Sequence, residues 1–208
     1  MESNTVFDEF TAEYDAWFDR HPEIYQSELL AMKQAIPQNQ TGIEIGVGSG
    51  RFAGPLQINY GVEPSVSMAA LAKQRGVKVI NAVAEKLPIE DQSYDFATMV
   101  TTVCFLNDIP KAFSEVHRIL KSGGTFIIGL IDRNSELGKK YEKQKSKNKF
   151  YRDAHFYSAT EITNLLSDSG FSNFSYWQTL ILPGENQIEQ PQPGFGNGSF
   201  VVIKSIKI

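Results

Sequence analysis

Short apolar runs and helical apolar patterns alternate along most of this chain. Apolar runs bounded by glycine, proline or polar residues are typical of buried strands, and apolar residues three and four positions apart are typical of amphipathic helices. A helix capped by Ser65 and another at 109–120 are expected between strands. Strands are expected at 42–46, 58–63, 77–82, 94–100 and 125–131. This alternation predicts an α/β fold with a parallel, doubly wound sheet and helices on both faces.

The pattern changes at both ends of the chain. Aromatic residues within 5–18 recur at helical spacing, which predicts one helix there, and 22–36 predicts a second. Near the C-terminus, Ser158 and Glu161 have the spacing of a capping box, so a helix is expected from there to about Ser169. The segments 171–182 and 199–208 are predicted strands, the last one antiparallel.

Composition excludes several classes of protein. The 208 residues are 41% hydrophobic, the mean hydropathy is -0.26 and the net charge is -4. Nucleic-acid binding needs clustered positive charge, so we expect no nucleic-acid partner. No apolar run approaches the ~20 residues of a membrane span, and no signal-peptide pattern is visible, so we expect no membrane partner and a cytoplasmic protein. A single cysteine, Cys104, excludes a disulfide framework.

The stretch from Ile43 to Phe52 carries the main candidate chemistry. It predicts a buried strand, a turn with glycines at alternate positions, and a helix that begins at or just after Arg51. Glu63 follows 17 residues after Gly46, where doubly wound folds bind the two hydroxyls of a ribose. A nucleoside cofactor is therefore predicted. Arg51 stands where the nicotinamide dinucleotide motif G-x-G-x-x-G needs its last glycine, which counts against NAD.

Five motifs in this order resemble those of a known family. They are Glu44-Ile45-Gly46-Val47-Gly48-Ser49-Gly50, then Glu63, Ala84-Glu85-Lys86-Leu87-Pro88, Ser93-Tyr94-Asp95-Phe96 and Leu120-Lys121-Ser122-Gly123-Gly124. The chain resembles class I S-adenosylmethionine-dependent methyltransferases, most closely the type 11 methyltransferase-domain group. The resemblance implies a Rossmann-like seven-stranded sheet with the last strand antiparallel beside the fifth. It also implies a single methyltransferase domain, 1–208, with an N-terminal helical cap at 1–37 and a substrate-side insert at 133–157.

The resemblance implies that S-adenosyl-L-methionine is the cofactor and assigns roles to residues. The glycines would let the backbone approach the methionine and ribose, and Glu63 would accept hydrogen bonds from the ribose hydroxyls. Val83 stands where the family often has an aspartate for the adenine amino group. The expected cofactor-binding residues are Tyr14, Gly46, Gly48, Gly50, Arg51, Glu63, Pro64, Ala84, Glu85, Thr101 and Phe105.

The methyl acceptor is expected to be a small molecule. Its pocket would form from the N-terminal helix, the loop at 105–107 and the aromatic segment 133–157. No catalytic residue or metal site is identified, although His21 and His155 are candidates for a general base. The lysine-rich stretch 139–149 either steers an anionic substrate or is a solvated helix face. An NAD(P)-dependent oxidoreductase and a non-catalytic S-adenosylmethionine-binding regulatory protein remain alternatives.

Overall fold

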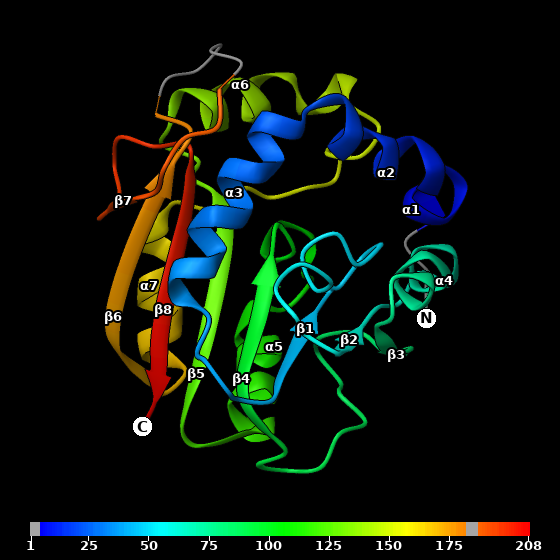
Figure 1. Cartoon of the computed structure of the whole chain (residues 1–208). Helices are drawn as coiled ribbons and strands as arrows, with labels where there is room; N and C mark the ends of the chain where they lie inside the picture. The colour runs from blue at the N-terminus through cyan, green and yellow to red at the C-terminus, as the bar shows by residue number, and fades with distance from the viewer. Residues whose placement is uncertain (1–4, 182–186) are drawn as a thin grey trace.

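The centre of the molecule is one sheet that is buried on both faces. In the computed structural model, which describes residues 5–181 and 187–208, the strands lie in the order β3-β2-β1-β4-β5-β8-β6-β7 (Figure 1). The strands are β1 (Gly42–Ile45), β2 (Tyr60–Val62), β3 (Lys78–Ile80), β4 (Tyr94–Val100), β5 (Leu120–Ile131), β6 (Phe171–Thr179), β7 (Gln192–Pro193) and β8 (Phe200–Lys207).

The strand directions confirm the expected α/β class. β1 pairs in parallel with β2 and β4, and β4 pairs in parallel with β5. β8 lies between β5 and β6 and is antiparallel to both, as expected for the last strand. Within the described residues the sheet has eight strands rather than seven, because Gln192 and Pro193 form a two-residue strand on the edge of β6. Leu182, the last residue of one predicted strand, lies outside the described residues.

Helices cover both faces of this sheet (Figure 1). They are α1 (Thr5–Glu9), α2 (Thr11–Arg20), α3 (Pro22–Ala35), α4 (Val66–Gln74), α5 (Ile109–Ile119), α6 (Glu136–Gln144) and α7 (Ala159–Asp168), with short 3₁₀ turns η1 (Val103–Phe105) and η2 (Lys145–Lys147). The predicted capping box is present at the start of α7, where Ser158 and Glu161 bond reciprocally. The single helix expected at 5–18 is two helices, because the backbone bends at Phe10.

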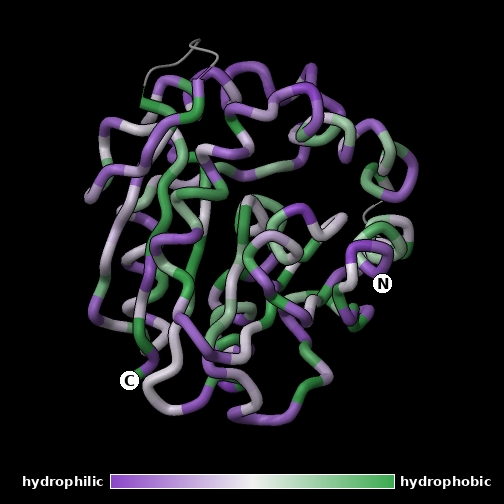
Figure 2. The backbone as a smooth tube through the Cα atoms, viewed as in Figure 1, coloured by the Kyte–Doolittle hydropathy of each residue, from purple (hydrophilic) through white to green (hydrophobic). Residues whose placement is uncertain are grey.

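Alternating side chains of the central strands build a core on each face. Phe126 and Ile128 of β5 pack with α5 and α7, whereas Ile127 between them packs with residues of α3. β8 divides in the same way, with Ile203 on the first face and Val202 on the second. This two-residue period, with both sides apolar, is what a central strand of a doubly wound sheet requires. Figure 2 shows the hydrophobic positions gathered in these strands and the hydrophilic ones around α6.

The helix expected to begin at Arg51 is a series of turns over residues 51–57. Gly54 and Leu56 donate to the carbonyls four residues before them, as in a helix. The corresponding hydrogen bond from residue 55 to the Arg51 carbonyl is missing, because Pro55 has no N–H group. The Arg51 carbonyl that it would have reached accepts instead from the hydroxyl of Tyr25 in α3. The prediction of a helix here was wrong because of this one missing donor.

Among the helices of residues 5–181 and 187–208, none has both the length and the apolar character that crossing a bilayer would demand.

Candidate active site

The loop after β1 leaves the sheet through three glycines with positive φ angles. These angles are 72° at Gly46, 54° at Gly48 and 81° at Gly50. A Cβ atom on Gly46 would lie 2.4 Å from Cγ2 of Thr102, and one on Gly50 would lie 3.1 Å from Cα of Ala72 in α4. A Cβ on Gly48 would meet no atom within 4 Å. Gly46 and Gly50 are therefore needed for packing, and Gly48 presents its backbone to open space.

Glu63 lies at the end of β2, beside this loop. Its Oε2 accepts a 2.9 Å hydrogen bond from the Gly48 N–H, and its Oε1 accepts one of 2.9 Å from the Ser65 N–H. The side chain is 7% exposed, and burial raises the pKa of its carboxyl, against the lowering effect of these two hydrogen bonds. Each carboxylate oxygen can accept more than one hydrogen bond. Glu63 therefore keeps capacity for a ligand beside the open face of Gly48.

Helix α1 contacts the turn that follows Glu63. Asp8 accepts a hydrogen bond from the Ser65 hydroxyl at 2.6 Å, and a second from the Ser67 N–H at 3.2 Å. Pro64, one of the predicted site residues, is half-buried, and its carbonyl accepts from the Asn81 amide at 3.0 Å. These contacts fix the turn between β2 and α4, on which Glu63 depends.

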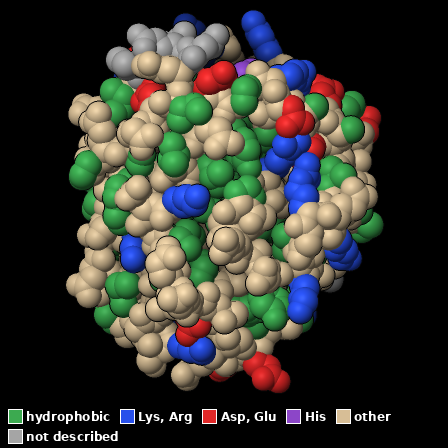
Figure 3. Space-filling view, in the orientation of Figure 1, with side chains coloured by type: hydrophobic (Ala, Val, Ile, Leu, Met, Phe, Trp, Pro, Cys, Tyr) green, Lys and Arg blue, Asp and Glu red, His purple; other side chains and the backbone are tan. Residues whose placement is uncertain are grey.

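Arg51 connects the glycine loop to helix α2. Its guanidinium donates to both carboxylate oxygens of Asp15, at 2.9 and 2.7 Å, and to Asp19 at 2.7 and 2.8 Å. Arg75 completes the group, since it donates to Asp15 at 2.8 Å and to the Ser49 carbonyl at 2.6 Å. Burial pushes the pKa of Asp15 upward, but the hydrogen bonds from the two arginines outweigh it and hold the pKa well below its usual range. Opposite charges lie together over this junction of α2 with the loop (Figure 3).

Thr101 ends β4 in a strained backbone conformation. Its φ angle is 50°, which is rare for a β-branched residue and costs of the order of 1–3 kcal/mol. Its N–H donates to the Gly129 carbonyl at 2.8 Å, which holds the backbone in this position. Burial raises the pKa of the Tyr14 phenol, and a hydrogen bond with the Thr101 side chain opposes that rise. The C-terminal end of β4 and helix α2 therefore meet here.

Three predicted site residues lie in the segments that follow β3 and β4. Ala84 is buried in the core that α5 shares with the sheet. Glu85 accepts a 3.0 Å hydrogen bond from the Asn107 N–H, so its carboxylate holds the loop after β4. Phe105, in η1, packs edge-on against Phe7 of α1 with ring centroids 5.2 Å apart.

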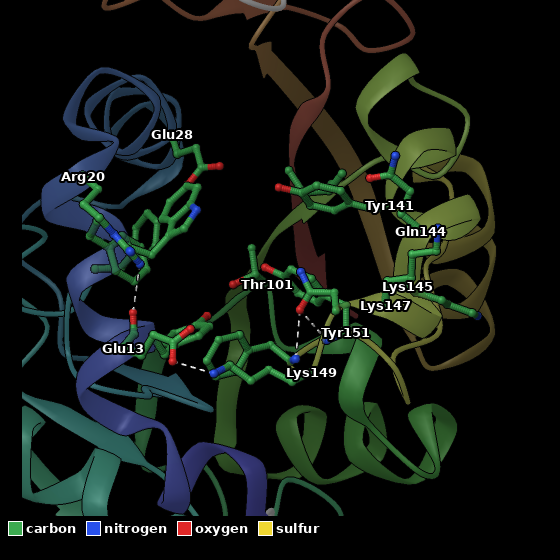
Figure 4. A pocket seen from close by; sticks show the side chains of 17 residues that line it. Glu13, Arg20, Glu28, Thr101, Tyr141, Gln144, Lys145, Lys147, Lys149 and Tyr151 are labelled. Atoms are coloured by element: carbon green, nitrogen blue, oxygen red, sulfur yellow. Dashed lines mark hydrogen bonds and ion pairs between the residues drawn. The ribbon is translucent and has the colours of Figure 1, made fainter.

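A cavity of about 500 Å³ lies over the C-terminal ends of β4 and β5, between α2 and α6. Figure 4 shows Thr101 between two walls, with Glu28 on one and Tyr141 on the other. Of the predicted site residues, Tyr14 and Thr101 line it. Its described lining consists of Glu13, Tyr14, Trp17, Phe18, Arg20, Glu28, Phe52, Thr101, Ile131, Tyr141, Gln144, Lys145, Lys147, Asn148, Lys149, Phe150 and Tyr151.

Glu28 is the functional candidate that the sequence reasoning missed. It lies in α3, is 5% exposed and turns its carboxyl into the cavity (Figure 4). Burial raises the pKa of this carboxyl to about 8. It precedes Ala31, Met32 and Ala35 by three, four and seven residues, all of them buried. An acidic residue on the apolar stripe of a helix was the signal that could have found it.

The remaining candidates were two histidines, Cys104 and the lysine-rich stretch 139–149. His21 stacks on Trp17, and His155 packs on Tyr157; neither is among the described lining of the cavity. Cys104 is buried, and burial raises the pKa of its thiol to about 12. Lysines of the 139–149 stretch do reach the cavity mouth, where Lys145 pairs with Glu142 at 2.7 Å and Lys149 pairs with Glu13. In the described part of the chain, no three His, Cys, Asp or Glu residues are grouped as a metal site.

Comparison with known proteins identifies the family of this site. Residues 43–128 match the methyltransferase-domain family. A solved structure of a SAM-dependent methyltransferase from Thermotoga maritima, a possible histamine N-methyltransferase, is 48% identical, with a TM-score of 0.95. That similarity covers 98% of this chain and 99% of the Thermotoga chain. The chain belongs to the class I S-adenosylmethionine-dependent methyltransferases. The expected relationship with the type 11 group is confirmed.

Two further proteins show how widely this methyltransferase resembles others. An uncharacterized protein of Methanocaldococcus jannaschii is 46% identical over 98% of this chain and 99% of its own length. Phosphoethanolamine N-methyltransferase 2 of Haemonchus contortus, solved with S-adenosyl-L-methionine, shares the fold at 18% identity and a TM-score of 0.61, over 86% of this chain and 52% of that one.

The family settles the cofactor and the type of activity. This methyltransferase is an enzyme whose cofactor is S-adenosyl-L-methionine, which excludes the nicotinamide-dependent and non-catalytic alternatives. The residues present fit that cofactor. The backbone at Gly48 has open space in front of it, and Glu63 beside it is a buried acceptor of hydrogen bonds. Asp15 and Asp19 occupy the guanidinium of Arg51.

Proposed function

We propose that the enzyme methylates a small molecule held in the cavity between α2 and α6. The observation that carries this proposal is the cavity itself, whose volume of about 500 Å³ is within the range of small-ligand pockets, ~300–1,000 Å³. It begins at Thr101 and Tyr14, on the cofactor side, and ends at Glu28. The Thermotoga maritima relative, a possible histamine N-methyltransferase, supports an acceptor of this size.

The cofactor would lie along the ends of β1, β2 and β4. Glu63 would accept hydrogen bonds from the ribose hydroxyls, and the Gly48 backbone would approach the ribose and methionine. Gly46 and Gly50 would contribute by allowing the loop to pack. Thr101 and Tyr14 would bind the amino-acid end. Pro64, Ala84, Glu85 and Phe105 would surround the adenosine, with Val83 offering no side-chain hydrogen bond to adenine. Arg51 would act indirectly, by holding α2 over the loop.

The reaction asks the protein mainly for alignment and exclusion of water. When bound, the cofactor supplies a methyl group on a positively charged sulfur. The residues around it would hold the acceptor atom about 3 Å from that methyl group, in line with the bond that breaks. We also propose that two parts of the single domain close over this site. The helical cap at 1–37 supplies one wall of the cavity and the insert at 133–157 supplies the other.

The test is methyl incorporation from a radiolabelled donor into matched pools of acceptors. One pool holds small amines, alcohols, thiols and carboxylates, and the others hold bulk RNA, DNA and denatured protein. We expect label in the small-molecule pool, and we expect Trp17→Ala, which opens the cavity wall, to reduce it. Incorporation into a macromolecular pool alone would contradict the proposal.

A further inference from the structure

Glu28 is a buried acid without a partner at the end of the cavity. The side chain is only 5% exposed, and among the described residues no hydrogen bond or ion pair reaches its carboxyl. Buried carboxylates are ordinarily paired with a cation or a metal. We propose that Glu28 recognises the acceptor as an amine, pairing with its ammonium group and taking the proton that the nitrogen must lose before methylation. This inference rests on the proposed function of the cavity.

The charge distribution around Glu28 favours a cationic ligand. Burial is the main cause that raises the pKa of the Tyr14, Tyr141 and Tyr151 phenols, and the negative charge of Glu28 adds to each rise. No positive group acts on the carboxyl in return, and burial alone raises its pKa. One wall of the cavity thus holds a potential negative charge that no described side chain neutralises.

Three of the four described cations that line the cavity, Arg20, Lys145 and Lys149, are engaged elsewhere, and the fourth, Lys147, does not shift the pKa of Glu28, which burial alone raises. Lys145 pairs with Glu142 and donates to the Ala154 carbonyl at 3.2 Å, and Lys149 pairs with Glu13. Arg20 donates to two carbonyls of its own helix, at 3.3 Å each. A positive charge at Glu28 would therefore come from the ligand. The facing groups that are charged or titratable are Glu13, Tyr14, Arg20, Tyr141, Lys145, Lys147, Lys149 and Tyr151.

The remaining lining suits an amine carried on an apolar or planar body. Trp17 and Phe18 of α2, Phe52 of the glycine loop and Phe150 present aromatic surface to the same space. Aromatic faces attract cations, and they do so more strongly when water is excluded. A hydroxyl acceptor could donate one hydrogen bond to Glu28, but only an ammonium group would also balance the charge of the ionised carboxylate.

The proton transfer has a simple balance. The N–H bond of the ammonium breaks, its electron pair remains on nitrogen, and the proton forms an O–H bond with the Glu28 carboxylate. Exclusion of water by the bound ligand lowers the cost of converting the ion pair into this pair of neutral groups. The neutral amine then has the lone pair that forms the new N–C bond, while the electrons of the broken S–C bond stay on sulfur.

Isothermal titration calorimetry with 2-phenylethylamine and its neutral analogue 2-phenylethanol tests this recognition. We expect the wild-type enzyme to bind the amine at least tenfold more tightly than the alcohol, and Glu28→Gln to bind both alike. Glu23→Gln removes the same charge from the same helix without touching the cavity lining, so it should keep the preference. Equal binding by the wild-type enzyme, or a preference that survives in Glu28→Gln, would overturn the inference.

Proton release provides a second, independent readout. At pH 8 the Glu28 carboxyl, with a pKa of about 8, is protonated in about half of the molecules. Binding of the amine should release about half a proton, measured by repeating the titration in buffers of different ionisation enthalpy, and Glu28→Gln should release none. No release by the wild-type enzyme would also refute the assignment. Each titration is made with and without S-adenosylhomocysteine. Failure of S-adenosylhomocysteine to bind would count against the proposed function, whereas failure of the amine alone would count only against Glu28.

Discussion

The N–H of Gly48 donates a 2.9 Å hydrogen bond to Oε2 of Glu63, so the glycine loop and the acid at the end of β2 form one unit. The same carboxylate accepts from the Ser65 N–H, which starts helix α4. Glu63 therefore has two tasks: it fixes the loop that faces the cofactor, and it presents its remaining lone pairs to a ligand.

Replacing Glu63 by alanine should weaken binding of S-adenosylhomocysteine by roughly 1–3 kcal/mol, the scale of hydrogen bonds to a charged group. Calorimetry measures this directly. The control is Glu115→Ala. The Glu115 carboxylate also accepts a hydrogen bond from a backbone N–H, that of Leu87, at 2.7 Å. That variant should lose stability and retain affinity. An unchanged dissociation constant for Glu63→Ala would contradict the ribose assignment.

The glycines of the loop should separate into two classes when replaced by alanine. Gly48→Ala meets no neighbour, so it should cost only the ~1–2 kcal/mol of a left-handed backbone while weakening cofactor binding. Gly46→Ala also collides with the branched side chain of Thr102, and should lose a further ~1–3 kcal/mol of stability. Chemical denaturation and calorimetry on both variants check this. Equal losses of stability would refute the distinction.

The sequence predicted those features that depend on local chemistry. The strand at 42–46, the glycine loop and Glu63 lie close together in the chain. The hydrogen bond between Gly48 and Glu63 joins two of these segments in the fold. The capping box of Ser158 and Glu161 was also readable, because its donors and acceptors lie within four residues. The parallel direction of the first five strands followed from the alternation of strands and helices, and the place of the last strand beside the fifth followed from the family resemblance.

The errors have physical causes of two kinds. The helix expected after Arg51 fails at Pro55, and that missing donor was visible in the sequence but was outweighed by the pattern of the motif. Glu28 was missed for a different reason. The acid on the apolar stripe of α3 was a local signal of a buried carboxyl. What the carboxyl faces depends on tertiary packing, which brings Tyr141 and Thr101 to the same cavity from distant parts of the chain.

Helix α2 should be held on the glycine loop by Asp15. The Asp15 side chain is 13% exposed, and its carboxylate pairs with both Arg51 and Arg75. Changing Asp15 to Asn removes this negative charge and leaves the charges of the two arginines unbalanced. We expect faster release of S-adenosylhomocysteine, by about tenfold, in stopped-flow fluorescence of Trp17. Asp91→Asn breaks an exposed ion pair with Arg118 and should leave this rate unchanged. Identical release rates in all three proteins would show that α2 is not held closed by this pair.

The pH dependence of stability should report on Glu28. Its pKa is about 8 in the folded enzyme and takes the ordinary glutamate value of 4.5 in the unfolded chain, so between these values the folded protein binds more protons than the unfolded one. Stability contributed by the neutral acid is complete below about pH 4.5, and it is lost as the pH rises towards and through 8. The loss has an upper limit of roughly 5 kcal/mol. Glu28→Gln cannot ionise, so its melting temperature should fall less than that of the wild-type enzyme between pH 5 and pH 9. Because the wild-type carboxyl has no described partner, the variant should also be the more stable protein at pH 9. Parallel melting curves for the two proteins across this range would mean that Glu28 is ionised and paired throughout.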